Sequence, residues 1–378
     1  MRVLHIHSGN LYGGVETVLV TLARHRDLCP AMEPHFALCF EGRLSGELAD
    51  AGVAVHLLGN VRVSRPVTVW RSRSLLRNLL QRHKFDVAVC HSAWSQAIFA
   101  PVVRSAGLPL VFWLHGATDG RHWLERWARN AAPDLALYNS QFTSSTLSRI
   151  YPRVRAELVF YPVASAEINY SNGNRATVRA ELDTPEDATV IIQASRMEAW
   201  KGQSLHLEAL SMLRDLPDWV CWQVGGAQRP QEARYFKELK NAAVRLGIAS
   251  RVHFLGQRSD VPKLLAAADI YCQPNTGPEP FGIAFVEALL ARLPIVTTAI
   301  GGATEIIDDS CGVLVQADNA DELGASLRRL IQDRTLRANL GAAGAARARK
   351  LCDPDTQMQH LYNLLAGISG DGLRQESN

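Results

Sequence analysis

The sequence predicts an α/β protein made of two doubly wound domains, each a parallel sheet with helices on both faces. The chain has 378 residues, more than one hydrophobic core usually serves, and 47% of them are apolar, which is enough for two cores. Short apolar or β-branched runs alternate with amphipathic stretches along almost the whole chain, as in parallel sheets. One segment, 164–187, interrupts this alternation with turn-forming residues and predicts a linker.

Strands are expected wherever a short apolar run is bounded by polar or turn residues. In the first half they are expected at 2–7, 35–40, 53–58, 86–91, 108–115, 135–139 and 157–161. In the second half they are expected at 189–194, 220–225, 252–255, 270–273, 295–298 and 312–315. Helices should fill the gaps, and three more close the chain at 320–332, 336–350 and 354–365.

This pattern divides the chain into a Rossmann-like domain over 1–165, a second over 166–350, and a last helix with a frayed tail over 351–378. In open α/β sheets, ligands bind beyond the carboxyl ends of the strands, where helix N-termini point into the crevice. Two such domains facing a central cleft suit a ligand that carries phosphates.

Bulk properties favour a cytoplasmic protein. The first residues read as a strand rather than as a secretion signal, and no stretch of about 18 apolar residues is present. The seven cysteines are widely spaced and are expected to be buried thiols. Net charge is only +3, but residues 1–165 hold 18 Lys and Arg against 11 Asp and Glu, so the first domain is basic.

The most informative segment is 274–289, which follows an expected strand and opens a helix. Pro280 and Gly282 delay the start of that helix. The N–H groups of Phe281, Gly282 and Ile283 can therefore point at an anionic or hydroxylated ligand.

Two carboxylates mark the ends of this motif: Glu279 lies in the loop, and Glu287 lies about one turn into the helix. They can accept hydrogen bonds from different hydroxyl groups of one extended ligand, such as a sugar and a ribose. The alternative, two solvated surface carboxylates, is disfavoured by the apolar run around them.

A second motif, 195–202, directly follows the first strand of the second domain. Arg196 and Lys201 can converge there on a diphosphate, the guanidinium through a fork of donors and the ammonium as a point charge. Gly225 and Gln257, at the ends of the next two strands, can contact a base or ribose. Two solvated surface cations are the alternative to a diphosphate site.

The first domain offers two weaker candidates. Gly13 and Gly14, between the first strand and the first helix, let the backbone approach a phosphate, although a plain turn also explains them. The spacing is not G-x-G-x-x-G, which disfavours a nicotinamide cofactor. His115 ends an apolar strand and can donate to a sugar hydroxyl, or it is a structural histidine.

No metal is expected. Asp353 and Asp355 form a D-x-D pair, but they begin the last helix and are better explained as a cap. No other Asp, His or Cys cluster has ligand spacing.

Together, Gly13 with Gly14, His115, Arg196 with Lys201, and the E-x7-E run from Glu279 to Glu287 resemble the retaining glycosyltransferases of family 4. The resemblance extends over about residues 2–365. It implies the GT-B fold, a nucleotide diphosphate-sugar donor on the second domain, an acceptor on the first, and a last helix that returns to the first domain. It also implies retention of anomeric configuration without a metal or other cofactor.

The resemblance also implies a role for each matched residue. Arg196, Lys201 and the Gly14 amide would stabilise the departing diphosphate. Glu279 would contact the donor sugar, Glu287 the ribose, and His115 the sugar near its reacting carbon. Two departures occur: Ser195 replaces the usual glycine before the arginine, and Arg292 must take a helix-capping geometry that glycine would take at lower cost.

The acceptor side is suggested by charge alone. Residues 62–84 hold seven Arg and Lys and no acidic residue until Asp86, with Trp70 and several leucines interleaved. This stretch can lie on an anionic membrane surface and present a lipid-linked glycan, or it is a helix with solvated arginines. Nucleic acid is a weaker alternative, since no recognised binding module accompanies the charge.

The leading hypothesis is therefore a hexosyltransferase of cell-surface polysaccharide or glycolipid synthesis, cytoplasmic or peripheral at the inner face of the membrane. Two alternatives remain open: a GT-B nucleotide-sugar epimerase, and a catalytically silent GT-B protein that binds a nucleotide or a partner.

Overall fold

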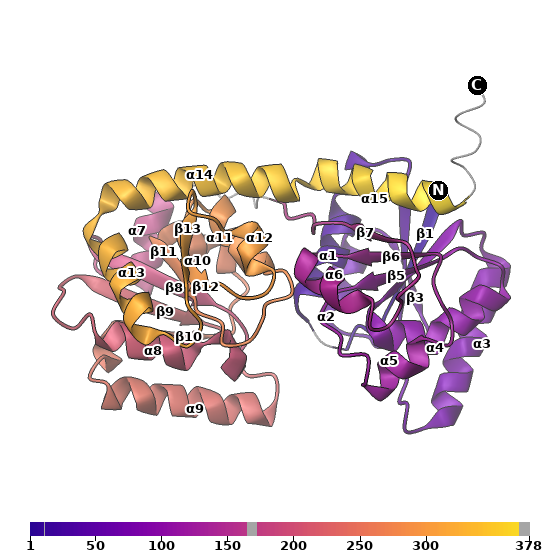
Figure 1. The fold of residues 1–378 in the computed structure, drawn as a ribbon, viewed down its shortest axis with the longest axis horizontal. Helices are drawn as coiled ribbons and strands as arrows, with labels where there is room; N and C mark the ends of the chain where they lie inside the picture. The colour runs from indigo at the N-terminus through magenta and orange to yellow at the C-terminus, as the bar shows by residue number, and fades with distance from the viewer. Residues whose placement is uncertain (11, 165–171, 370–378) are drawn as a thin grey trace. The chain divides into compact units, whose positions relative to one another are not determined.

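The structure is a computed structural model that describes residues 1–10, 12–164 and 172–369 (Figure 1). The chain divides into two compact units, which are described separately: Met1–Ala164 with Cys352–Asn378, and Ser165–Leu351. Each unit contains one parallel sheet with helices on both sides, so the α/β expectation is confirmed. The expected frayed tail lies outside the described residues.

The first unit has a seven-stranded parallel sheet in the order β3-β2-β1-β4-β5-β6-β7. Its strands are β1 (Arg2–His7), β2 (Glu33–Leu38), β3 (Ala54–Leu57), β4 (Val87–His91), β5 (Leu110–Leu114), β6 (Leu135–Tyr138) and β7 (Ala156–Leu158). Its helices are α1 (Gly14–Arg24), η1 (Arg26–Leu28), α2 (Arg43–Asp50), α3 (Pro66–Arg82), α4 (Ser92–Ser105), α5 (Trp123–Ala128), α6 (Gln141–Leu147) and α15 (Pro354–Ser369).

The second unit has a six-stranded parallel sheet in the order β10-β9-β8-β11-β12-β13. Its strands are β8 (Thr189–Ala194), β9 (Trp219–Val224), β10 (Val252–Gly256), β11 (Ile270–Gln273), β12 (Ile295–Thr298) and β13 (Gly312–Val315). Its helices are α7 (Asn172–Glu181), η2 (Ala199–Lys201), α8 (Gln203–Ser211), α9 (Pro230–Arg245), η3 (Ala249–Arg251), α10 (Val261–Ala267), α11 (Ile283–Leu290), α12 (Ala303–Ile306), α13 (Ala320–Gln332) and α14 (Arg334–Cys352).

A strand occurs at every place where the sequence predicts one, and only the ends differ by a few residues. The central strands are buried on both faces because helices cover the sheet from both sides, which explains their continuous apolar runs. In both sheets the order reverses beside the first strand of the unit, β1 or β8, where crevices form in this class of fold.

The expected linker over 164–187 is wrong for part of its length, since Asn172–Glu181 forms helix α7. Its arginines explain the difference. Arg175 and Arg179 both form ion pairs with Asp269, and the buried Arg179 also donates to four backbone carbonyls. Tertiary hydrogen bonds thus hold a helix that has little apolar surface.

Several local expectations are confirmed. Ser140 caps α6 by accepting from the N–H of Thr143, and Asp353 accepts from the N–H of Thr356 at the start of α15. Arg292 takes a left-handed φ of 61° after α11, the capping geometry expected of it. All seven cysteines are buried free thiols.

Candidate functional site

The loop between β8 and α8, residues 195–202, carries the two predicted cations. The Arg196 guanidinium pairs with Glu198 at 3.0 Å and is partly exposed. The Lys201 ammonium lies 2.5 Å from the Glu279 carboxylate and over the Trp200 ring. Both cations therefore lie beyond the carboxyl end of β8, and each has a carboxylate partner on its own unit.

Glu279 lies in the loop that follows β11 and is buried. Its Oε2 also accepts from the side-chain amides of Gln273 and Asn275, at 3.3 and 3.4 Å. Its main chain is fixed as well, because its carbonyl accepts from the Gly302 N–H at 2.7 Å. A Cβ at Gly301 would lie 2.4 Å from the same carbonyl oxygen, so glycine is required there.

The start of α11 has the geometry that the sequence predicts. Gly282 adopts a φ of 99° immediately before the helix, and a Cβ there would lie 2.3 Å from the Phe285 ring. Phe281 is buried, and Ile283 begins the helix. The first N–H groups of a helix have no partner within it, so the backbone of Gly282 and Ile283 can donate to a ligand.

Glu287 differs from Glu279 because no hydrogen bond or ion pair holds its side chain within the described part of the chain. Burial raises the pKa of Glu287 to about 7. A half-buried carboxylate without a partner is unfavourable unless a ligand supplies donors. The Glu287 carboxylate on α11 is therefore available to accept hydrogen bonds from the hydroxyl groups of a ligand.

The structure gives Gly225 and Gln257 different roles. The Gly225 N–H already donates to the Gly256 carbonyl at 2.8 Å, and a Cβ on Gly225 would lie 1.9 Å from the Ser195 carbonyl oxygen. Gly225 thus lets the β8–α8 loop pass close to β9. Gln257 is exposed and packs against Gly226.

On the first unit, a buried carboxylate organises the glycine turn. Glu16 accepts from the Gly13 N–H at 2.9 Å and is hydrogen-bonded to His7 Nε2 at 2.7 Å. The Gly13 amide is therefore already used. Gly14 is the first residue of α1, and its N–H has no partner inside the helix.

His115 is also engaged on both sides of its ring. Its Nε2 is hydrogen-bonded to His91 at 2.8 Å, and its Nδ1 is hydrogen-bonded to the Tyr161 hydroxyl at 2.5 Å. His91 is in turn bonded to His5 at 3.0 Å, and Asn139 donates to Tyr161. To bind a sugar through its ring, His115 would have to give up one of these bonds.

Burial keeps the hydrogen-bonded row of His5, His91 and His115 uncharged. It lowers the pKa of His5 to about 3 and lowers the pKa values of His91 and His115 well below the usual range, and the neighbouring histidines lower the last two further. These three rings are therefore neutral at neutral pH. His7 lies 6.1 Å from His91, ring to ring, which connects the row to the glycine turn.

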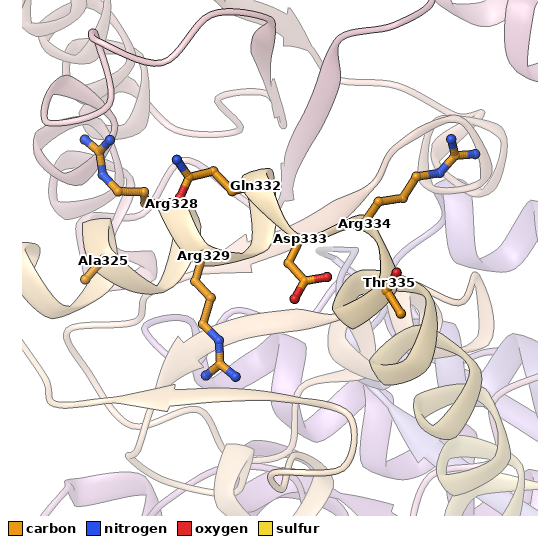
Figure 2. Close-up of a pocket in the computed structure, with 7 residues that line it drawn as sticks. All are labelled: Ala325, Arg328, Arg329, Gln332, Asp333, Arg334 and Thr335. Carbon is orange, nitrogen blue, oxygen red and sulfur yellow. The ribbon is translucent and has the colours of Figure 1, made fainter.

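A pocket elsewhere on the second unit has a lining less suited to catalysis. A surface pocket of about 590 Å³ lies where α13 meets α14, lined by Ala325, Arg328, Arg329, Gln332, Asp333, Arg334 and Thr335 (Figure 2). Its three arginines point in different directions, and Arg328 is paired with Asp215. Within the described ranges, no group of three or more His, Cys, Asp or Glu is arranged to hold a metal, and no helix is long and apolar enough to cross a membrane.

Comparison with known proteins identifies the class first. The chain superposes on the crystal structure of Anabaena Alr3699/HepE in complex with UDP-glucose with a TM-score of 0.84, covering 97% of this chain and 100% of the other at 26% identity. WaaG, a glycosyltransferase of lipopolysaccharide biosynthesis, gives 0.71 at 17% identity, over 98% and 100% of the two chains. The fold is that of the GT-B glycosyltransferases.

The family follows from the sequence. Residues 12–162 match Glycosyltransferase Family 4, and residues 174–347 match Glycosyl transferases group 1. Phosphatidyl-myo-inositol mannosyltransferase of Mycobacterium leprae is 34% identical over 80% of this chain and 79% of its own length. Its counterpart from Mycolicibacterium smegmatis is 26% identical over 97% and 94%. The chain therefore belongs to the glycosyltransferases that combine these two regions, Glycosyltransferase Family 4 and Glycosyl transferases group 1, and it is a glycosyltransferase.

Sequence reasoning missed the polar residues that hold the candidate site residues in place. On the first unit this is Glu16, which binds the Gly13 N–H; on the second they are Gln193, Glu198, Gln203, His206, Gln273 and Asn275. Gln193 and Gln273 lie at the carboxyl ends of strands that are otherwise continuous apolar runs. A buried glutamine at the end of such a run is the signal that would have found them.

Proposed function

We propose that the enzyme is a retaining transferase that moves a hexose from a nucleotide diphosphate-sugar to a glycan or lipid-linked acceptor. One observation carries this proposal: the β8–α8 loop holds both Arg196 and Lys201, and Lys201 contacts the Glu279 carboxylate. Two cations from one short loop suit a diphosphate, and a carboxylate beside them suits sugar hydroxyls. Glu287, without a partner, suits the ribose.

In this mechanism the bond from the sugar C1 to the diphosphate oxygen breaks, and the acceptor oxygen bonds to C1 on the same face. Arg196, Lys201 and the Gly14 amide stabilise the negative charge that develops on the diphosphate, which is usually the largest contribution to such catalysis. The acceptor proton passes to the departing phosphate. We infer that the two cations do this without a metal.

Relatives support this reading of donor and acceptor. HepE has been crystallised with UDP and with UDP-glucose, and the relatives include mannosyltransferases of phosphatidyl-myo-inositol and a lipopolysaccharide glucosyltransferase of Escherichia coli. These names concern those proteins. A further relative, from Corynebacterium glutamicum, is a GDP-mannose-dependent mannosyltransferase. For this chain these names favour a uridine or guanosine donor and a surface polysaccharide or glycolipid product.

Isothermal titration tests the donor directly. UDP or GDP should bind, and Arg196→Ala should weaken binding and slow hydrolysis of the nucleotide sugar. Excess EDTA should leave the hydrolysis rate unchanged. If neither nucleotide binds and Arg196→Ala has no effect, the transferase mechanism is wrong; binding without any turnover would instead indicate a silent binding protein.

We also propose that α3 rests on an anionic membrane surface. The helix exposes Val67 and Trp70, which are 60% and 68% exposed, beside Arg71 and Arg77. Exposed tryptophan next to arginine is typical of helices that lie at the headgroup level. Such a position would bring the first unit to a lipid-linked acceptor.

Sedimentation with liposomes tests this second proposal. The protein should pellet with anionic vesicles at low salt, less at high salt, and not with zwitterionic vesicles. Trp70→Ser with Arg71→Gln should abolish pelleting. Val244→Ser on α9, which removes an equally exposed apolar side chain from the second unit, is the control and should leave pelleting unchanged. No pelleting of the natural sequence at low salt would refute the proposal.

A further inference from the structure

A buried polar network lies beneath the β8–α8 loop. Gln193 on β8, and Gln203 and His206 on α8, are fully buried, and Gln223 on β9 is 1% exposed. Burying an amide costs free energy unless each polar atom finds a partner, so apolar residues would fill these positions more simply. The polar groups therefore call for an explanation other than packing.

Two amides of this network hold the loop that carries the cations. Gln193 Nε2 donates to the backbone carbonyl of Lys201 at 2.8 Å. Gln203 Nε2 donates to the backbone carbonyl of Arg196 at 2.9 Å and to the Ser195 hydroxyl at 3.1 Å. One buried side-chain amide thus binds the main-chain carbonyl of each cationic residue, Gln193 at Lys201 and Gln203 at Arg196.

His206 and Gln223 together orient the first amide. His206 Nδ1 is 2.9 Å from Gln193 Oε1, and Gln223 Nε2 lies 3.4 Å from the same oxygen and 3.1 Å from that Nδ1. Burial lowers the pKa of His206 to about 3, so the ring is neutral, and the Gln193 oxygen accepts either from its Nδ1–H or from the Gln223 amide. With its oxygen bound on that side, Gln193 turns its NH2 group toward Lys201.

Two glycines allow the rest of the loop to pack closely against neighbouring backbone. Gly202 has a φ of 75°, and a Cβ there would lie 1.7 Å from the Pro274 carbonyl oxygen. Gly225 allows equally close approach of the Ser195 carbonyl on the other side. The Trp200 carbonyl accepts from the Thr276 N–H at 2.9 Å. The loop is thus held both by close packing and by the two amides.

We propose that Gln193 and Gln203 are positioning residues for sugar transfer: they fix the main chain at Lys201 and Arg196, so that both cations are in place when charge develops on the diphosphate. This inference rests on the proposed function. Fixed charges act mainly on the transition state, because they need no reorganisation as the donor bond breaks. Loosening the loop should therefore slow turnover more than it weakens donor binding.

Two variants at one position test the proposal through nucleotide-sugar hydrolysis. Gln203→Glu keeps the size of the side chain but cannot donate when ionised, and Gln203→Met cannot donate at any pH. At pH 8 both should lower kcat by about tenfold or more, as expected for slight misplacement of catalytic groups. The KM should change by less than about threefold, since ground-state binding depends less on the fixed geometry.

The pH profile separates positioning from general damage. As the pH falls from 8 to 6, the buried carboxyl of Gln203→Glu gains a proton and can donate again, so its kcat relative to the natural enzyme should recover. Gln203→Met should show no recovery. Gln96→Glu is the matched control: this buried glutamine donates to the Ala131 carbonyl at 2.9 Å on the first unit, and its loss should lower stability without changing kcat.

Each result has a distinct meaning. Unchanged kcat in both Gln203 variants, or an equal fall in Gln96→Glu, overturns the positioning proposal. Arg196→Ala, measured in the same assay, distinguishes failure of the positioning proposal from failure of the proposed function. If Arg196→Ala is slow while the Gln203 variants are normal, only the positioning proposal fails; if Arg196→Ala is also normal, the proposed function fails.

Discussion

The second unit holds a pair of cations, Arg196 and Lys201, beyond the end of a strand, whereas the first unit holds a row of three neutral histidines, His5, His91 and His115. Arg196 and Lys201 are paired with carboxylates. His5, His91 and His115 instead form a buried hydrogen-bonded row whose pKa values are lowered. Both groups follow from the same parallel fold. The difference teaches that the fold supplies the edge where polar groups meet, while a carboxylate partner decides whether a buried group there keeps its charge.

The largest expected effect tests which unit carries the catalytic charge. Lys201→Met removes the ammonium next to Glu279 and should lower kcat by about 10²- to 10³-fold, the cost of losing one group that stabilises a developing charge. His115→Gln should cost clearly less. Hydrolysis kinetics measure both, with Lys240→Met on α9 as a control. An equal loss in His115→Gln would show that the neutral row matters as much as the cations.

The next prediction concerns acid. Because the pKa of His5 is lower folded than unfolded, the unfolded state binds more protons, and stability falls as the pH drops from about 6.5 toward 3. Between pH 7.5 and 5.0 this amounts to about 2 kcal/mol for such a histidine. Hydrogen exchange at both pH values should show that β1 and β4 lose more protection than β11, because His5, His91 and His115 all have lowered pKa values on the first unit, against His206 on the second. His5→Phe should reduce that difference, and an unchanged difference would contradict the assignment.

Donor binding should carry a smaller pH effect through Glu287. Ribose hydroxyls favour the ionised carboxylate and lower its pKa from about 7, so affinity for a nucleotide sugar should rise about tenfold from pH 6 to pH 8. Calorimetry with an intact nucleotide sugar measures this, because its diphosphate does not titrate in that range. Glu287→Gln should flatten the profile. A slope that persists in Glu287→Gln would assign the proton to another group.

The smallest effect concerns the backbone rather than charge. Arg292 has a φ of 61°, which costs a residue with a side chain more than glycine. Arg292→Gly should stabilise the protein by about 0.5–1 kcal/mol, after the loss to unfolded-chain entropy is subtracted. Thermal melting measures this gain, and donor hydrolysis should not change. A lower melting temperature would mean that the Arg292 side chain makes contacts that outweigh the strain.

The sequence was sufficient for the strand pattern because both sheets are parallel and buried, so each strand appears as a short apolar run. It was also sufficient for the Gly282 turn, since Pro280 and Gly282 have few conformations open to them. It could not give the partners of Lys201 or His115. Those depend on which side chains meet across neighbouring strands, and Tyr161 and His115 are 46 residues apart. Helix α7 was missed because its stability comes from Asp269, far along the chain.

The buried thiols have a practical consequence. Burial raises the pKa values of Cys39, Cys221 and Cys352 to about 12, and the other four cysteines are buried as well. A thiol reacts as its anion, so the folded protein should be inert to maleimide dyes. A single cysteine introduced by Trp70→Cys would then be labelled alone, without removal of any native cysteine. An environment-sensitive dye there would report when α3 reaches a lipid surface.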